Sequence, residues 1–231
     1  MVTLSSAPIN ALTWTWGAIS LYVFVFKSFF TYKRTKNPLA RIYTWLSLIF
    51  GTGLLFFGLP GLLTQNPHIL HYTYFIADGF MQLSMQLGIW LIWFLGLRTY
   101  VKLRYLLAIS VPFSLALLTT EVLTSNVTLS KSPHLIVYTD HFPVLLMKSI
   151  IYIAVAIPIG FFLLRQVPHQ TTLSSKLKSL VAGLMFIIVC IAAVSNNIFD
   201  KGSDTVQSAT ELAIFFTIFL VVQLSRRASR R

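Results

Sequence analysis

Residues 69–97, ILHYTYFIADGFMQLSMQLGIWLIWFLGL, form a long apolar run that is interrupted by one acid and two amides. A helix needs about 20 mostly apolar residues to cross roughly 30 Å of hydrocarbon. This run exceeds that length and contains a single charged side chain, Asp78. It therefore predicts a transmembrane helix that tilts or projects into the interface.

The composition of the whole chain extends this prediction. Of the 231 residues, 56% are hydrophobic and 10% are charged, whereas about 25% are charged in a typical globular domain. A soluble domain of this size would not bury so much apolar surface, so a water-soluble enzyme is excluded. The 19 Phe, 9 Tyr and 5 Trp also exclude a disordered chain. The chain is therefore predicted to be an integral membrane protein, and its lone cysteine, Cys190, excludes an internal disulfide.

Read with the same window, the chain divides into seven predicted spans joined by mostly short linkers. The spans are residues 12–30, 42–63, 69–97, 105–120, 144–164, 180–199 and 208–224. The fourth is the weakest because it is short and contains Pro112, and the long linker 121–143 follows it. We expect an all-α fold in which residues 1–231 form a single seven-helix membrane domain, with no separate soluble domain.

Basic residues gather on one side of this predicted bundle. The bases that follow spans one, three, five and seven are Lys33, Arg34, Lys36, Arg41, Arg98, Lys102, Arg104, Arg165, Lys176, Lys178, Arg226, Arg227, Arg230 and Arg231. The opposite side carries Lys131 and Lys201 together with Glu121, Asp140, Asp200 and Asp204. Because positive loops stay cytoplasmic, we expect the N-terminus outside and the C-terminus inside. The net charge of +12 then indicates contact with anionic lipid and no nucleic-acid partner.

Four ionisable residues fall inside the predicted spans: Lys27, Asp78, Lys148 and Glu211. Placing each of these side chains in the membrane costs at least about 2.5 kcal/mol on insertion scales, so the presence of each one needs an explanation. Lys27 and Glu211 lie near span ends, where snorkelling or solvation suffices, and Lys148 either snorkels outward or pairs inward. Asp78 lies nine residues after Ile69, about 13 Å along the helix and near the middle of the membrane.

Asp78 begins a polar stripe, because Gln82 and Gln86 follow at i+4 and i+8 on the same helix face. Two interpretations remain open: a hydrogen-bonded seam between helices, or a solvated ligand cavity. We predict an outward-opening pocket with Asp78 at its floor and Lys148 as its counter-ion. The residues expected to bind ligand, from their common depth, are Asp78, Gln82, Gln86, Lys148, Tyr152, Asn196, Asn197 and Glu211.

The sequence lacks the arrangements that would indicate an enzyme or a cofactor-binding protein. The last span, 208–224, has no lysine to form a retinal Schiff base. The five histidines fall at span ends or in loops, so no metal site within the membrane is indicated. No Ser or Cys nucleophile has a histidine at membrane depth. We therefore expect no catalytic residue, no metal and no cofactor.

Two turns carry a resemblance to a known family. Lys36-Asn-Pro-Leu-Ala-Arg41 leads into the second span, and Lys176-Leu-Lys-Ser-Leu-Val-Ala-Gly183 leads into the sixth. With the Asp-to-Gln stripe and the long outer loop, they resemble the heptahelical sensor region that precedes many prokaryotic histidine kinases. The resemblance implies a receptor that passes an external or membrane cue to a cytoplasmic output. Because Ser225-Arg-Arg-Ala-Ser-Arg-Arg231 adds no kinase domain, we expect signalling to pass to a separate cytoplasmic protein.

A small-solute transporter is the alternative, built as three helices, a linker helix and three more. Asp78 and Glu211 each lie toward the outer side of the third helix in its triad. The Pro-Gln signature of the sugar-transporting type is missing. The predicted function is therefore a multi-pass plasma-membrane receptor for an unknown small ligand, with a transporter as the alternative.

Overall fold

The computed structural model describes residues 7–131, 134–199 and 202–224, and the chain is 85% helical. The helices are α1 (Ile9–Thr35), α2 (Pro38–Leu63), α3 (Pro67–Ile92), α4 (Leu103–Thr124), α5 (Phe142–Arg165), α6 (Leu173–Phe199) and α7 (Gly202–Leu224). Among the described residues, six helices are long and apolar enough to cross a membrane, and the apolar part of α7, Ala209–Leu224, is shorter. The prediction of an all-α, membrane-type helical bundle is thus confirmed.

Local signals determine where α2 and α3 begin. Asn37 and Asn66 each accept a hydrogen bond from the backbone N–H two residues later, at 2.9 and 3.0 Å. Pro38 and Pro67 then occupy the first helical position, where a missing N–H costs nothing. Lys36 ends α1 in the left-handed conformation, with φ 54°. These caps keep the α1–α2 and α2–α3 links short.

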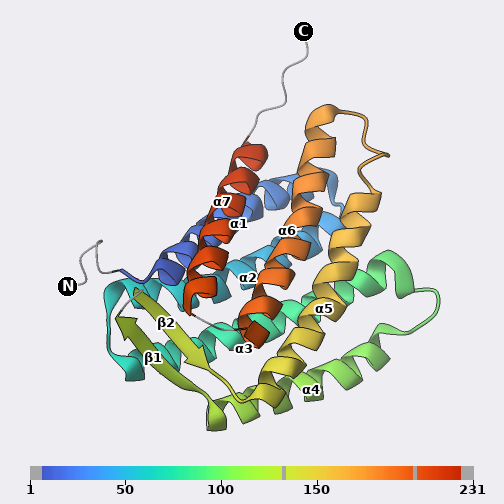
Figure 1. The fold of residues 1–231 in the computed structure, drawn as a ribbon. Helices are drawn as coiled ribbons and strands as arrows, with labels where there is room; N and C mark the ends of the chain where they lie inside the picture. The colour runs from blue at the N-terminus through green and yellow to red at the C-terminus, as the bar shows by residue number, and fades with distance from the viewer. Residues whose placement is uncertain (1–6, 132–133, 200–201, 225–231) are drawn as a thin grey trace.

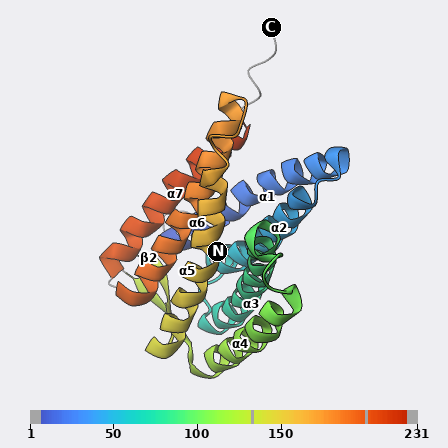
Figure 2. The same cartoon turned by 90° about the vertical axis from the view of Figure 1, so that its right-hand side faces the viewer.

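The helices surround a common interior (Figure 1). α1 packs against α2 and α7, α3 packs against α2 and α5, and α6 packs against α5 and α7. α4 stands outside this ring, against α3 and α5. In Figure 2, α1 and α2 diverge from α5, α6 and α7 toward one end of the bundle. We call this end, with links 36–37, 98–102 and 166–172, the basic end, and the other, with residues 64–66 and 125–141, the hairpin end.

Glycines allow the helices in each half of the bundle to approach closely. A Cβ on Gly160 of α5 would lie 2.8 Å from the carbonyl oxygen of Gly183 in α6, and the reverse distance would be 2.9 Å. A Cβ on Gly58 of α2 would lie 2.6 Å from the carbonyl oxygen of Ala11 in α1. Only hydrogen fits in these places, which is typical of close packing between membrane helices.

Two features of the long linker and its flank differ from the prediction. The weakest predicted span, 105–120, is the full-length helix α4, Leu103–Thr124, with Pro112 accommodated inside it. The linker itself contains an antiparallel hairpin of β1 (Asn126–Lys131) and β2 (His134–Thr139), in which Leu129 pairs with Ile136. The hydropathy window missed this hairpin because each of its two strands has six residues, which is too short for a span.

The hairpin covers one end of the bundle because α1 binds its edge. The Asn10 side chain donates from Nδ2 to the Ile136 carbonyl at 2.7 Å and accepts from the Ile136 N–H at 3.2 Å. The Asn10 side chain thereby forms, with the backbone of Ile136, the two hydrogen bonds that a neighbouring strand would otherwise form. Leu135 and Ile136 are buried against the helices, so the hairpin end of the interior is closed.

Candidate functional site

The buried polar centre of the molecule is built around the ammonium group of Lys148 on α5. Lys148 Nζ lies 3.4 Å from Asp78 Oδ1 and 3.0 Å from Asp140 Oδ2, and it pairs directly with Glu121. It also donates to the Tyr74 hydroxyl at 3.0 Å, and that hydroxyl donates to Asp140 Oδ2 at 2.7 Å. Gln82 Nε2 donates to Asp78 Oδ2 at 3.4 Å. We call these six residues the Lys148 cluster.

The Lys148 cluster joins elements that are far apart in the sequence. Asp78 comes from α3, Glu121 from α4, and Asp140 from the link between β2 and α5. All three carboxylates are almost completely buried: the exposed fraction is 1% for Asp78, 0% for Glu121 and 3% for the Asp140 side chain. Because charges buried at this depth are costly unless paired, the cluster fixes α3, α4, α5 and the hairpin relative to one another.

The cluster contains more acceptors than donors. Three carboxylates share one ammonium group, so the fully ionised cluster would carry an excess of negative charge. Glu121 Oε2, Asp140 Oδ1 and Gln82 Oε1 are buried and form no hydrogen bond with any described residue. Such underpaired polar groups are costly in an apolar interior, so the Lys148 cluster is a candidate functional site.

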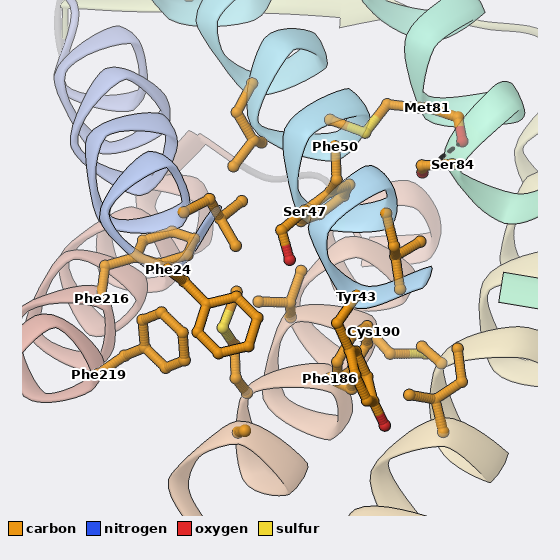
Figure 3. A pocket seen from close by; sticks show the side chains of 18 of the residues that line it. Phe24, Tyr43, Ser47, Phe50, Met81, Ser84, Phe186, Cys190, Phe216 and Phe219 are labelled. Atoms are coloured by element: carbon orange, nitrogen blue, oxygen red, sulfur yellow. Dashed lines mark hydrogen bonds between the residues drawn. The ribbon is translucent and has the colours of Figure 1, made fainter. Parts of the chain in front are cut away.

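A cavity of about 1410 Å³ runs through the bundle between this cluster and the basic end. Tyr74, Asp78 and Lys148 line its closed end, at the hairpin. Its middle is apolar and aromatic, as Figure 3 shows. The side chains labelled there include Phe24 of α1, Tyr43 and Phe50 of α2, Met81 of α3, Phe186 and Cys190 of α6, and Phe216 and Phe219 of α7.

The cavity reaches solvent at the basic end. The lining residues that are exposed all lie there: Phe30, Thr31, Lys33, Arg34, Asn37 and Leu224. At the hairpin end, Asn10, Tyr74 and Ile136 are buried. This geometry differs from the predicted pocket, which was to open on the outer side with Asp78 at its floor. Asp78 lies at the far, closed end instead, because the hairpin covers the side on which the pocket was expected to open.

The structure brings together part of the predicted ligand set. Asp78, Lys148 and Tyr152 line the cavity, and the pairing of Asp78 with Lys148 is present as the depth argument predicts. Gln82 contacts Asp78 but is not among the lining residues. Gln86 forms hydrogen bonds with α4 instead, donating to Ser114 Oγ at 2.8 Å and accepting from Ser110 Oγ at 2.6 Å. Within the polar stripe, Asp78 therefore lines the cavity, whereas Gln86 forms hydrogen bonds between α3 and α4.

Of the remaining predicted residues, one lies away from the cavity and two lie outside the described side chains. Glu211 is exposed on α7 and is not among the cavity-lining residues. Asn196 and Asn197 belong to α6, but their side chains lie outside the part of the structure that is described.

Sequence reasoning missed Glu121, Asp140 and Tyr74. Both acids were assigned to the outer loop, because the fourth span was drawn too short and the hairpin was not foreseen. One local signal was available: no Gly or Pro separates Glu121 from the apolar run 113–120 that precedes it. Nothing local marks Asp140, which reaches Lys148 only because the hairpin folds back over the bundle.

Within the described residues, no group of three or more His, Cys, Asp or Glu side chains is arranged to hold a metal ion. The Lys148 ammonium occupies the centre of the acidic cluster. Comparison of the chain with protein-family models and with curated proteins finds no match.

Proposed function

We propose that this protein is a multi-pass plasma-membrane receptor that binds a small ligand in the interhelical cavity and passes its occupancy to a separate cytoplasmic protein. The observation that carries the proposal is the cavity itself, which is lined by six of the seven helices and ends on buried charges. The basic end faces the cytoplasm in this proposal, because positive loops stay inside. The proposed activity is binding and signalling without catalysis or a cofactor.

The size and lining of the cavity support a binding role. Its volume of about 1410 Å³ exceeds the roughly 300–1,000 Å³ typical of small-molecule sites. The walls are mostly apolar, with a few polar groups at the two ends, which is the usual composition of a ligand site. The aromatic residues around the middle come from helices on opposite sides of the ring, so a ligand there would bridge the two halves.

The Lys148 cluster supports a signalling role. It forms the closed end of the cavity and holds α3, α4, α5 and the hairpin together through one ammonium group. A ligand that contacts Tyr74, Asp78 or Lys148 would change which acceptors share that group. A buried ionic network with alternative pairings is the kind of two-state element that ligand binding can bias. The resemblance to kinase sensor regions stays a prediction.

A transporter is the second candidate, and one observation favours it. The cavity is closed at the hairpin end and open at the basic end, which is the geometry of one state of an alternating-access carrier. A carrier must also adopt the opposite state, with the hairpin end open. A receptor needs no such exchange, so sidedness separates the two functions.

Cys190 supplies the probe for this test. It is the single cysteine of the chain, it lines the cavity, and it is 3% exposed. The wild-type protein in oriented vesicles would be treated with a small membrane-impermeant thiol reagent from each face, with Cys190→Ser as the control for background. Labelling from the cytoplasmic face alone is the expected result.

Each other outcome has a distinct meaning. Labelling from both faces would favour the transporter. Labelling from neither face, in protein whose thiol reacts after unfolding, would contradict an accessible cavity and with it both functions.

A further inference from the structure

We infer that the cavity binds an anionic amphiphile, whose carboxylate or phosphate head lies among basic side chains at the basic end and whose apolar chain extends toward the Lys148 cluster. This inference rests on the proposed ligand-binding function and names the ligand's chemical class. It follows from the distribution of charge and apolar surface along the cavity.

The mouth of the cavity is positively charged. Lys27, Lys33 and Arg34 of α1 line it together with Lys178 of α6. The chain has six acidic residues: Asp78, Glu121, Asp140, Asp200, Asp204 and Glu211. None of them lies, by its place in the sequence, in the links or helix ends of the basic end. An anionic group that entered the mouth would therefore meet several basic side chains, and Lys and Arg side chains bind carboxylate and phosphate groups strongly.

Behind this mouth lies a long apolar section. On α2 alone, the lining residues extend from Leu39 to Phe57, which is about 27 Å of helix at 1.5 Å per residue. The side chains around it are mainly Phe, Leu, Val and Met, and the hydroxyls labelled in Figure 3 are those of Tyr43, Ser47 and Ser84. A compact polar solute would leave most of this surface without contacts, whereas an extended hydrocarbon chain would cover it.

The closed end sets the direction of the ligand. The Lys148 cluster carries three carboxylates for one ammonium group, so a second anionic group placed there would be repelled. The opposite ends of the cavity thus differ in the sign of their charge. An amphiphile with one anionic head binds in one orientation only, with the head at the mouth.

Two sources could supply this chemistry: an anionic phospholipid of the surrounding bilayer, or a free long-chain acid. The test uses the full chain in neutral-lipid nanodiscs and measures binding of a fluorescent long-chain polyene carboxylate and of the corresponding uncharged alcohol. We expect the carboxylate to bind at least about tenfold more tightly, the factor that one charge-assisted hydrogen bond contributes. Nanodiscs that contain anionic phospholipid would weaken this binding if the bilayer is the source and leave it unchanged if it is not.

Matched variants localise the effect. Lys33→Gln with Arg34→Gln removes two charges from the cavity mouth, and Lys36→Gln with Arg98→Gln removes two from the same end outside the lining. The carboxylate preference should disappear in the first variant and persist in the second. Ser47→Phe, which fills the apolar section, should reduce binding of both probes.

The outcomes separate this inference from the proposed function. Equal binding of carboxylate and alcohol, with both lost in Ser47→Phe, would overturn the anionic class while leaving a ligand-binding cavity. Equal loss of preference in both charge variants would overturn the assignment of the head to the mouth. No binding of either probe, or binding unaffected by Ser47→Phe, would overturn the inference and the cavity as a binding site together.

Discussion

Lys148 is the residue on which the buried ion pairs of the described structure converge. Its ammonium group pairs with Asp78, Glu121 and Asp140 and donates to Tyr74, at an exposed fraction of 4%. The cluster contains three carboxylates but only this one ammonium group. Loss of the cation would therefore leave three buried carboxylates without a counter-ion, whereas loss of one carboxylate would bring the cluster closer to neutrality.

We expect Lys148→Met to destabilise the protein by about 3–5 kcal/mol, the usual cost of removing one partner from a buried ion pair. The matched change is Glu121→Gln, whose amide oxygen can still accept from Lys148 and which removes one excess negative charge. We expect it to cost less than about 1.5 kcal/mol, the scale of one neutral hydrogen bond. The measurement is the fraction of monodisperse protein after heating in detergent. Similar melting of Lys148→Met and wild type would contradict the central role of this side chain.

At the scale of helices, the protein combines close pairs with a wide interior. α5 and α6 touch at Gly160 and Gly183, and α1 and α2 touch near Gly58. The two pairs diverge toward the basic end (Figure 2), and both contribute residues to the cavity lining. Backbone contacts at glycines make each pair a rigid unit, because a neighbouring carbonyl cannot move as a side chain can. Changes of shape in this bundle are therefore expected between pairs, around the cavity, and not within them.

We expect Gly183→Ala to lower stability by about 1–3 kcal/mol, the range for overpacking a tight contact. Its Cβ would meet the Gly160 carbonyl oxygen at 2.9 Å and force α5 and α6 apart. Gly79→Ala on α3 is the control, because a Cβ there meets nothing within 4 Å. Alanine forms helix better than glycine by about 1 kcal/mol, so this variant should melt at or above the wild-type temperature. The same sign of change in both variants would contradict the role of glycine in the α5–α6 contact.

At the scale of the whole molecule, the two ends differ in cover, in charge and in access to the cavity. The hairpin end is covered by β1 and β2, holds the described acids of the Lys148 cluster, and is closed by Asn10. The basic end has short links and an open cavity mouth. This polarity gives any ligand one entrance.

The orientation of these ends in the membrane is open to direct measurement with single cysteines in a Cys190→Ser background. We expect Thr99→Cys, in the α3–α4 link, to react with an impermeant reagent from the cytoplasmic face only, because positive loops stay inside. His68→Cys, at the start of α3, should react from outside only. Leu224→Cys, at the end of α7, should match Thr99→Cys if α7 completes a seventh crossing. Its labelling from outside would reduce the crossings to six.

The sequence by itself determined the helical membrane class, the approximate place of the seven helices, and the depth that pairs Asp78 with Lys148. These are properties of single segments, set by how many apolar residues follow one another and by caps such as Asn37 and Asn66. The observed α6 and α7 begin seven and six residues before their predicted starts. Only the tertiary structure decided that Glu121 and Asp140 complete the Lys148 cluster, that Gln86 forms hydrogen bonds with α4, and that the cavity is closed at the hairpin end. The physical reason is that a side chain's partners depend on how helices cross and on where a hairpin folds back, which involves contacts between distant residues that no local window contains.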